Sequence, residues 1–229
     1  MATLAKTTTS HQSFAHRILW ECAQRHLAHA KEKTQGSWYF HLSAMVMAYL
    51  AYEAYLNYVG ETVAPEVWAT ARDAFSRDPY RGTHGKLMKL LKRYKLTPPN
   101  FQSRPSSCVF ELRAFRDEVV HARAHRTTHV AVHREDKLPP PVPRWLHQLV
   151  TEARAKRLLG DLEAFIEDLH RRFRSTEDSH LLWPTALKGS LAFEHGSTQL
   201  QANPTPHPDA REARRPATEN IAHAGGRER

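Results

Sequence analysis

The chain has 229 residues, a length typical of one domain with tails, and its formal net charge is +9. Its two cysteines, Cys22 and Cys108, exclude a disulfide framework and are typical of an intracellular protein. The positive charge favours RNA or DNA as partners, or serves solubility alone, because part of it lies in the C-terminal tail.

The N-terminus, MATLAKTTTSHQSFAH, lacks the apolar core of a signal peptide. The most apolar run, LSAMVMAYLAYEAYLNYVG, contains Glu53 and Asn57. A carboxylate at the centre of a bilayer costs about 2.5–3.5 kcal/mol. We therefore expect this run to be a buried helix of a cytoplasmic protein without membrane association.

Helical periodicity dominates the first two-thirds of the chain. It predicts a first helix over residues 11–33, after a flexible N-terminus of residues 1–10. Gly36 breaks that helix. A second helix over residues 37–59 should end at Gly60, and it should be central because it is apolar on nearly all sides.

Shorter elements follow. Pro65 can start a short helix that runs through Trp68 and Phe75, and SRDPYRGTHG is typical of a turn-rich loop. The run KLMKLLKRYK predicts a basic amphipathic helix that LTPPN ends. A further amphipathic helix is expected over residues 106–126.

Beyond residue 126, THVAVH alternates like an extended segment, and three consecutive prolines exclude a helix. A last long helix is predicted over residues 145–173. We expect residues 176–195 to dock loosely and residues 196–229 to form a disordered basic tail. The prediction is an all-α fold, a bundle of four to five helices within residues 11–175.

The helix ELRAFRDEVVHARAHR contains the most informative motif, in which Arg116 is followed by Asp117 and, five residues on, by His121. Similar arginine–histidine spacings recur elsewhere by chance, but this pair lies within a strong amphipathic helix. Five residues correspond to about 500°, so the two side chains do not share one face of the helix. They can converge through the reach of the arginine, or across a symmetric interface between two copies.

On these residues the chain resembles the HEPN superfamily. LRAFRDEVVHAR is similar to its signature helix of arginine, a polar residue, three residues and histidine, although Asn is the usual polar residue where this chain has Asp117. AMVMAYLAYEAYLN resembles the partner helix of that family, with Glu53 and Asn57 at the matching positions. The resemblance covers about residues 37–126.

The resemblance implies a helical bundle that pairs as a two-fold homodimer and, in active members, metal-independent RNA cleavage without a cofactor. Arg116 and His121 would then be the catalytic pair, with Asp117, Glu53 and Asn57 in supporting positions. Many relatives keep the fold without cleaving RNA, so the family alone does not establish activity.

The same chemistry follows from the residue types. RNA cleavage through the 2′-hydroxyl needs a base, an acid and a charge partner for the phosphate. An imidazole can serve as acid or base near neutral pH. A guanidinium binds phosphate oxygens in a bidentate manner.

Glu53 lies on an apolar stripe of the second helix, and a buried carboxylate must be paired or protonated. Arg116 lies on the apolar stripe of its own helix, between Leu112 and Val119. We therefore predict an ion pair between Glu53 and Arg116 that joins the two central helices. This pair can orient Arg116 for function, or it can be purely structural.

Two other readings concern cations and metals. Lys86, Lys89, Lys92 and Arg93 lie outside the leucine stripe of the basic helix and can follow a nucleic-acid backbone, or can simply face solvent. Asp117 with His121 and His125 is the tightest set of metal ligands. The metal is the less favoured alternative, so no metal site is assigned.

The leading hypothesis is a HEPN-like protein that binds or cleaves RNA, of the toxin or defence type, with an antitoxin or another protein as a further partner. The alternative is a non-catalytic HEPN-like module that dimerises or binds a partner, in which Arg116 is structural. Phosphate-binding, dinucleotide-binding, Cys-x2-Cys and Gly-x-Ser-x-Gly motifs are absent from the sequence.

Overall fold

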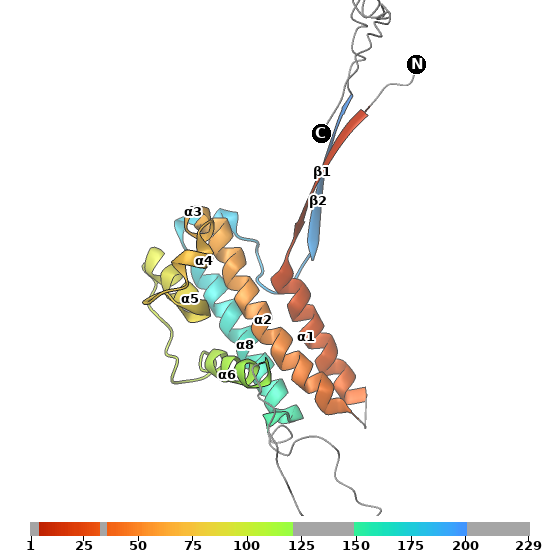
Figure 1. Ribbon diagram of the computed structural model, residues 1–229, viewed down its shortest axis with the longest axis vertical. Helices are drawn as coiled ribbons and strands as arrows, with labels where there is room; N and C mark the ends of the chain where they lie inside the picture. The colour runs from red at the N-terminus through yellow and green to blue at the C-terminus, as the bar shows by residue number, and fades with distance from the viewer. Residues whose placement is uncertain (1–4, 33–35, 121–148, 201–229) are drawn as a thin grey trace, which may run out of the picture. The chain divides into compact units, whose positions relative to one another are not determined.

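The computed structural model describes residues 5–32, 36–120 and 149–200. Within that part of the chain, a helical body and a two-stranded sheet can each be described (Figure 1). The long helices of the body are α1 (Ala15–Glu32), α2 (Ser37–Val63), α5 (Gly82–Arg93), α6 (Cys108–Val120) and α8 (Glu152–Arg174). The body therefore confirms the prediction of a helical bundle.

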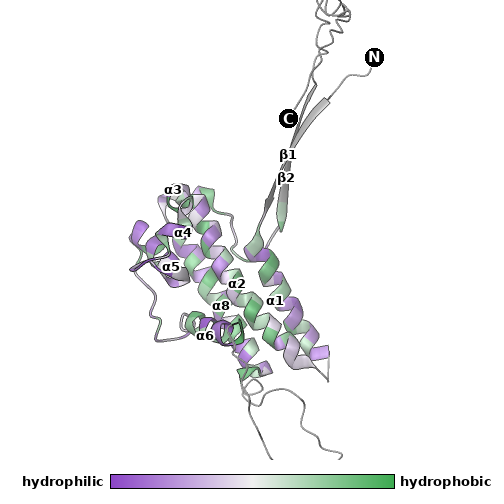
Figure 2. Ribbon diagram, in the orientation of Figure 1, coloured by the Kyte–Doolittle hydropathy of each residue, from purple (hydrophilic) through white to green (hydrophobic). Residues whose placement is uncertain are grey.

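Helix α2 is the central element, as its composition predicts. It packs against α1, α5, α6 and α8. Its buried residues recur every three or four positions, so they cover about half of the helix circumference, and they include Ala44, Met45, Ala48, Tyr52, Tyr55 and Leu56. Hydrophobic residues accordingly recur along its whole length (Figure 2). Partly buried residues such as Leu42, Val46 and Tyr58 widen this apolar surface, which is broad enough to contact several helices at once.

The prediction that Gly60 ends this helix is wrong. Helix α2 continues to Val63, and the chain then enters α3 (Pro65–Trp68) and α4 (Ala71–Ala74). A Cβ atom added to Gly60 would lie 1.9 Å from Cε2 of Trp68. Gly60 therefore serves the close approach of the Trp68 indole and not the termination of the helix.

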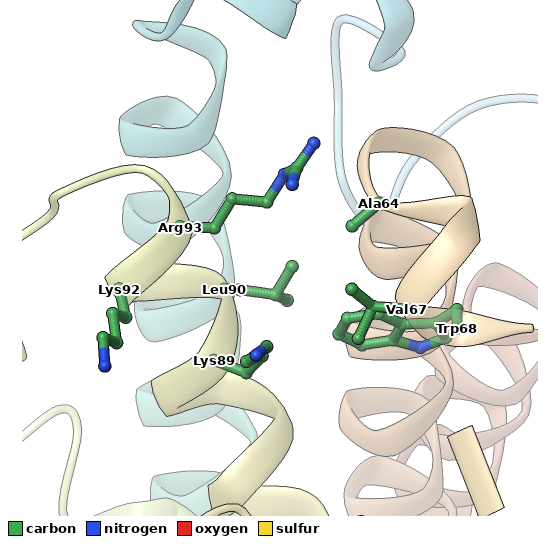
Figure 3. A pocket seen from close by; sticks show the side chains of 7 residues that line it. All are labelled: Ala64, Val67, Trp68, Lys89, Leu90, Lys92 and Arg93. Atoms are coloured by element: carbon green, nitrogen blue, oxygen red, sulfur yellow. The ribbon is translucent and has the colours of Figure 1, made fainter. Parts of the chain in front are cut away.

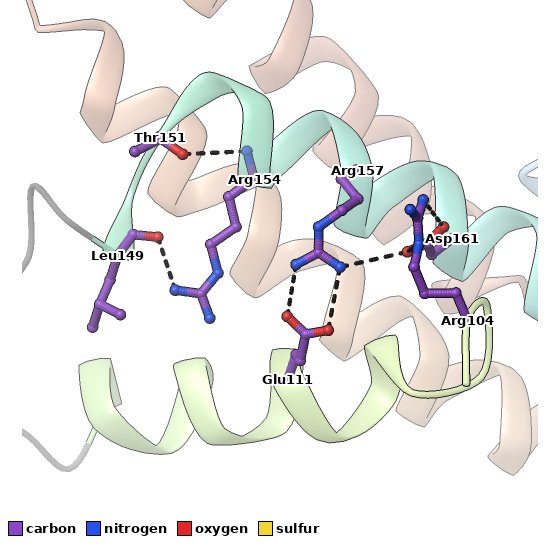
Figure 4. Close-up of polar contacts among 7 residues, drawn as sticks. All are labelled: Arg104, Glu111, Leu149, Thr151, Arg154, Arg157 and Asp161. Atoms are coloured by element: carbon purple, nitrogen blue, oxygen red, sulfur yellow. Dashed lines mark hydrogen bonds and ion pairs between the residues drawn. The ribbon is translucent and has the colours of Figure 1, made fainter. Parts of the chain in front are cut away.

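The last long helix begins later than predicted. The sequence pattern placed its start near residue 145, but α8 begins at Glu152. Thr151 has an extended backbone, and its hydroxyl accepts a hydrogen bond from the backbone N–H of Arg154 at 3.2 Å. This N-cap ends the preceding segment and fixes the first turn of α8 (Figure 4). Residues 145–148 lie outside the described residues.

Helices α6 and α8 are joined by a network of two arginines and two carboxylates (Figure 4). Arg157 binds Glu111 through two hydrogen bonds of 3.2 and 2.7 Å, and Arg104 binds Asp161 through two of 2.7 and 2.8 Å. Arg157 also lies 3.6 Å from Asp161. The hydrogen bonds from Arg157 lower the pKa of Glu111. Bidentate pairs of this kind fix the angle between helices.

Residues 182–191 follow a short 3-10 helix, η2 (Glu177–Leu181), and hydrogen-bond to α1, α2 and α8 through His16, Tyr58 and His170. Arg17 is only 1% exposed and donates to the carbonyl groups of Thr185, Ala186 and Ser190 at 2.8, 3.3 and 2.9 Å. His16 Nε2 lies 3.1 Å from the Ala186 carbonyl. These buried donors hold a segment that has little regular structure of its own.

Strands β1 (Ala5–Ser13) and β2 (Ala192–Leu200) form a two-stranded antiparallel sheet (Figure 1). The all-α prediction did not include them. Residues 5–10 were expected to be flexible and 196–200 to be disordered, and the first helix accordingly begins at Ala15 instead of residue 11. Threonines in β1 favour the strand conformation, and pairing satisfies the backbone groups of both segments. Residues 201–229 lie outside the described residues.

Candidate functional site

An open hollow on the helical body lies between α2, α5 and α6. Its volume is about 410 Å³, and it is lined by Tyr49, Glu53, Gly82, Thr83, Arg113, Arg116 and Asp117. Helix α6 supplies the cations, α2 supplies the carboxylate of Glu53, and the first turn of α5 closes one side. Three of the residues that the sequence singled out, Glu53, Arg116 and Asp117, therefore lie in one place.

The predicted ion pair between Glu53 and Arg116 is confirmed. Arg116 Nη2 lies 3.3 Å from Glu53 Oε1, and the two side chains keep 23% and 26% of their surface exposed. The pair is thus neither fully buried nor free in solvent. A partly exposed guanidinium of this kind is accessible to a ligand in the hollow.

Arg116 makes further contacts that fix its position. Its Nη1 lies 2.7 Å from Asp117 Oδ1, and its guanidinium carbon lies 5.0 Å from the centre of the Tyr49 ring. Its Nε is buried and has no hydrogen-bond partner among the described residues. Two carboxylates and an aromatic face therefore hold the guanidinium.

Thr83 was not predicted as a site residue, yet its hydroxyl donates to Glu53 Oε1, the same oxygen that pairs with Arg116. Thr83 lies in the first turn of α5, where the sequence predicted a loop, so no signal pointed to it. Burial raises the pKa of the neighbouring Tyr49, and the Thr83 hydroxyl acts in the opposite direction. The carboxylate of Glu53 thereby connects three helices.

Arg113 and His84 extend the site along α6 and α5. Both line a small pocket, with Tyr49 and Thr83, that adjoins the hollow. Arg113 Nε lies 3.7 Å from Asp117 Oδ2, and its side chain is 51% exposed. Burial, and then the charge of Arg113, lower the pKa of His84. A neutral imidazole beside a guanidinium is the form that can accept a proton.

Sequence spacing could have found Arg113, which lies three residues before Arg116 and therefore on the same side of the helix. His84 follows Arg77 by seven residues, which is one of the arginine–histidine spacings that recur by chance, so spacing alone did not point to it. The packing of α5 beside α6 places His84 near Arg113, with the rings of His84 and Phe110 5.3 Å apart between their centres.

The four cations of α5 lie in two different environments. Lys86 does not face solvent with the others but donates to Asn57 Oδ1 on α2 at 2.8 Å. Burial lowers its pKa, and the charges of Glu53 and Glu61 act against that effect. Lys89, Lys92 and Arg93 lie further along α5, at a separate pocket. The four cations thus do not form one continuous basic face.

His121 and His125 lie outside the described residues, as does the segment that follows. The pairing of Arg116 with His121, and the set of Asp117, His121 and His125 considered for a metal, therefore remain predictions. Within the described ranges no cluster of three histidine, cysteine or acidic side chains is placed to hold a metal ion. In the same ranges no helix combines the length and the apolar character needed to span a bilayer.

Cys108 has the properties of a structural cysteine and not of a nucleophile. It is fully buried against α8, and burial raises the pKa of its thiol to about 12. A thiol that stays protonated at neutral pH is a poor nucleophile. The chemistry of the described site therefore rests on arginine, carboxylate, hydroxyl and imidazole groups.

Comparison of the chain with protein-family models, with curated proteins and with solved structures finds no match.

Proposed function

We propose that the protein is a HEPN-like RNA-binding protein that receives an RNA phosphate in the hollow between α2, α5 and α6. The single observation that carries this proposal is the joint placement of Arg113 and Arg116 at an open hollow of about 410 Å³. Guanidinium groups bind phosphate oxygens in a fixed, bidentate geometry. The net charge of +9 favours a polyanion in general.

The two carboxylates in the hollow, Glu53 and Asp117, compete with a phosphate for Arg116. Arg116 is shared between Glu53 and Asp117, so a phosphate must compete with both. Arg113 is half exposed and lies 3.7 Å from its only described carboxylate, Asp117. Arg113 is therefore the better first contact for a phosphate. Arg116, whose side chain is 23% exposed, would then add its positive charge while it stays paired with Glu53.

RNA cleavage is the catalytic form of this proposal. In it, an imidazole takes the 2′-hydroxyl proton, the 2′-oxygen attacks phosphorus, and the departing 5′-oxygen receives a proton. His121 is the imidazole that the signature helix predicts. His84 is a second one, since it lies beside Arg113 in the adjoining pocket. Acid–base help of this kind typically contributes about 10²–10⁴-fold to the rate.

The test is an RNA cleavage assay in EDTA with the wild type and the variants His121→Ala, His84→Ala and Arg116→Ala. Cleavage that persists in EDTA and is lost in His121→Ala supports the signature-helix chemistry, whereas loss in His84→Ala alone assigns the base to α5. Equal traces of cleavage in all four proteins indicate contamination and reject the nuclease.

A non-catalytic module is the second candidate, and one observation favours it. Arg116 binds two carboxylates and stacks on Tyr49, which is the arrangement of a structural arginine. In that case the protein dimerises or holds a partner protein, with no RNA chemistry. Retained dimerisation, measured by light scattering, with no RNA binding in the wild type would support the module and reject the first proposal.

A further inference from the structure

A second pocket, distinct from the hollow at Arg116, lies at the other end of α5. Its volume is about 340 Å³, and it is lined by Ala64, Val67, Trp68, Lys89, Leu90, Lys92 and Arg93. Helix α5 separates the two: from Thr83 to Lys92 the helix rises about 14 Å. The pocket has no part in the function proposed above, and its volume lies in the range of small-molecule sites, about 300–1,000 Å³.

One side of this pocket is apolar, and its residues are largely buried and tightly packed. Trp68 and Leu90 are 7% and 0% exposed, and Val67 and Ala64 lie on the Trp68 side (Figure 3). The Trp68 indole already packs directly against Gly60, so the ring cannot move further into the core. The Trp68 indole N–H is also buried without an acceptor among the described residues. Such a surface favours a flat apolar or aromatic group.

The opposite rim carries positive charge. In Figure 3 the side chains of Lys89 and Arg93 extend from α5 toward the Trp68 wall, while Lys92 points away from it. Lys89 Nζ lies 4.9 Å from the centre of the Tyr80 ring, which holds the ammonium near the rim. Arg93 Nη1 lies 3.2 Å from Glu66 Oε1, an exposed pair that solvent screens. Two cations against one carboxylate leave the rim net positive.

We propose that this pocket binds a small amphipathic anion, whose aromatic or aliphatic body lies against Trp68, Val67 and Leu90 and whose carboxylate lies between Lys89 and Arg93. The apolar wall selects the body, and the rim selects the negative charge. A neutral ligand of the same shape would leave the two cations without a partner and would bind more weakly.

The test uses 2-naphthoate and its uncharged counterpart 2-naphthamide, titrated into the full-length protein by calorimetry. We expect one molecule of naphthoate to bind per chain and naphthamide to bind at least about tenfold more weakly, since a hydrogen bond to a charged group contributes about 1.5–3 kcal/mol. Equal affinities for the two probes, or no naphthoate binding at all, would overturn the proposal.

Three variants locate the site. Lys89→Ala should weaken naphthoate binding about tenfold, and Lys156→Ala, which makes the same charge change at a half-exposed position of α8 outside the pocket, should alter it less than about twofold. Val67→Phe should abolish binding by filling the pocket, and its unfolding curve shows whether it is folded. An equal loss in Lys89→Ala and Lys156→Ala, or naphthoate binding that survives in a folded Val67→Phe, would overturn the assignment.

Discussion

Glu53 Oε1 accepts the Thr83 hydroxyl and lies 3.3 Å from Arg116 Nη2, so one carboxylate oxygen on α2 connects to both α5 and α6. The Glu53 carboxylate therefore holds the Arg116 side chain in place at the edge of the hollow. Without it, α5 and α6 would still pack on α2 through apolar residues, but the guanidinium would lose one of its two carboxylates. The function proposed for the hollow therefore depends on a residue that need not touch the RNA.

A double-mutant cycle measures this connection. Glu53→Gln, Arg116→Met and the double variant should show a coupling of about 1 kcal/mol in the free energy of unfolding, because the pair is half-buried and charged. Urea unfolding at pH 7 gives the four values. A coupling of zero within error would mean that the two side chains do not interact in solution, and the structural basis of the site would be lost.

A pair of glycine substitutions tests the contact between α2 and Trp68. Gly60→Ala should destabilise the protein by more than about 2 kcal/mol, because the added Cβ would overlap the indole at 1.9 Å. Gly160→Ala in α8 is the matched control, since nothing lies within 4 Å of its Cβ position. That variant should gain about 0.5–1 kcal/mol from its higher helix propensity. Thermal unfolding of both variants measures the two changes in stability. Equal changes would contradict the close contact between Gly60 and Trp68.

The network between α6 and α8 should be far more sensitive than a surface ion pair. Asp161 is 8% exposed and faces both Arg104 and Arg157, so Asp161→Asn should lower the free energy of unfolding by about 2–4 kcal/mol. Glu163→Gln removes an ion pair of 3.3 Å to the exposed Lys188 and should change it by less than about 0.5 kcal/mol. Urea unfolding of the two variants makes the measurement, and a similar small effect in both would show that the network adds little.

Acid should weaken the attachment of residues 182–191 through His16. Burial, and then the charge of Arg17, lower the pKa of His16 from 6.5 to about 4. Between those two pH values the unfolded chain binds the proton and the folded chain does not. Stability is therefore complete above pH 6.5 and falls by about 1.4 kcal/mol per pH unit from this group as the pH drops toward 4. Above pH 6.5 this contribution should be flat.

His16→Gln keeps a donor for the Ala186 carbonyl but cannot take up a proton. The difference in unfolding free energy between wild type and variant should therefore shrink as the pH falls from 7 to 4.5. Carboxylates titrate in both proteins and cancel in that difference. A difference that stays constant over this range would mean that His16 is solvated and has an ordinary pKa.

Periodicity and burial patterns predicted the central position of α2 and the ion pair of Glu53 with Arg116, because a charged residue on an apolar stripe requires a partner. They failed where the outcome depends on tertiary contact. Gly60 reads as a helix end in sequence, yet it is needed for the approach of Trp68. Thr83 lies in a segment rich in glycine and proline, and only the packing of α5 on α2 brings it to Glu53. The HEPN resemblance stays a prediction.

The pairing of β1 with β2 illustrates a different limit. Residues 5–13 and 192–200 are far apart in sequence, and neither segment alternates strongly enough to predict a strand by itself. Pairing supplies what each segment lacks, since backbone groups of one satisfy those of the other. A long-range pairing of this kind has no local signal in the chain.

The most direct test of the central claim is the affinity of a single-stranded RNA for the wild type, Arg113→Ala and Arg171→Ala, measured by fluorescence anisotropy in EDTA. Arg171 is an exposed arginine of the last turn of α8 that pairs with Asp168, so it controls for net charge. We expect Arg113→Ala to weaken binding about tenfold and Arg171→Ala less than twofold, because only Arg113 lines the hollow. Equal affinities of the two variants, or no RNA binding by the wild type, would contradict the placement of RNA in the hollow.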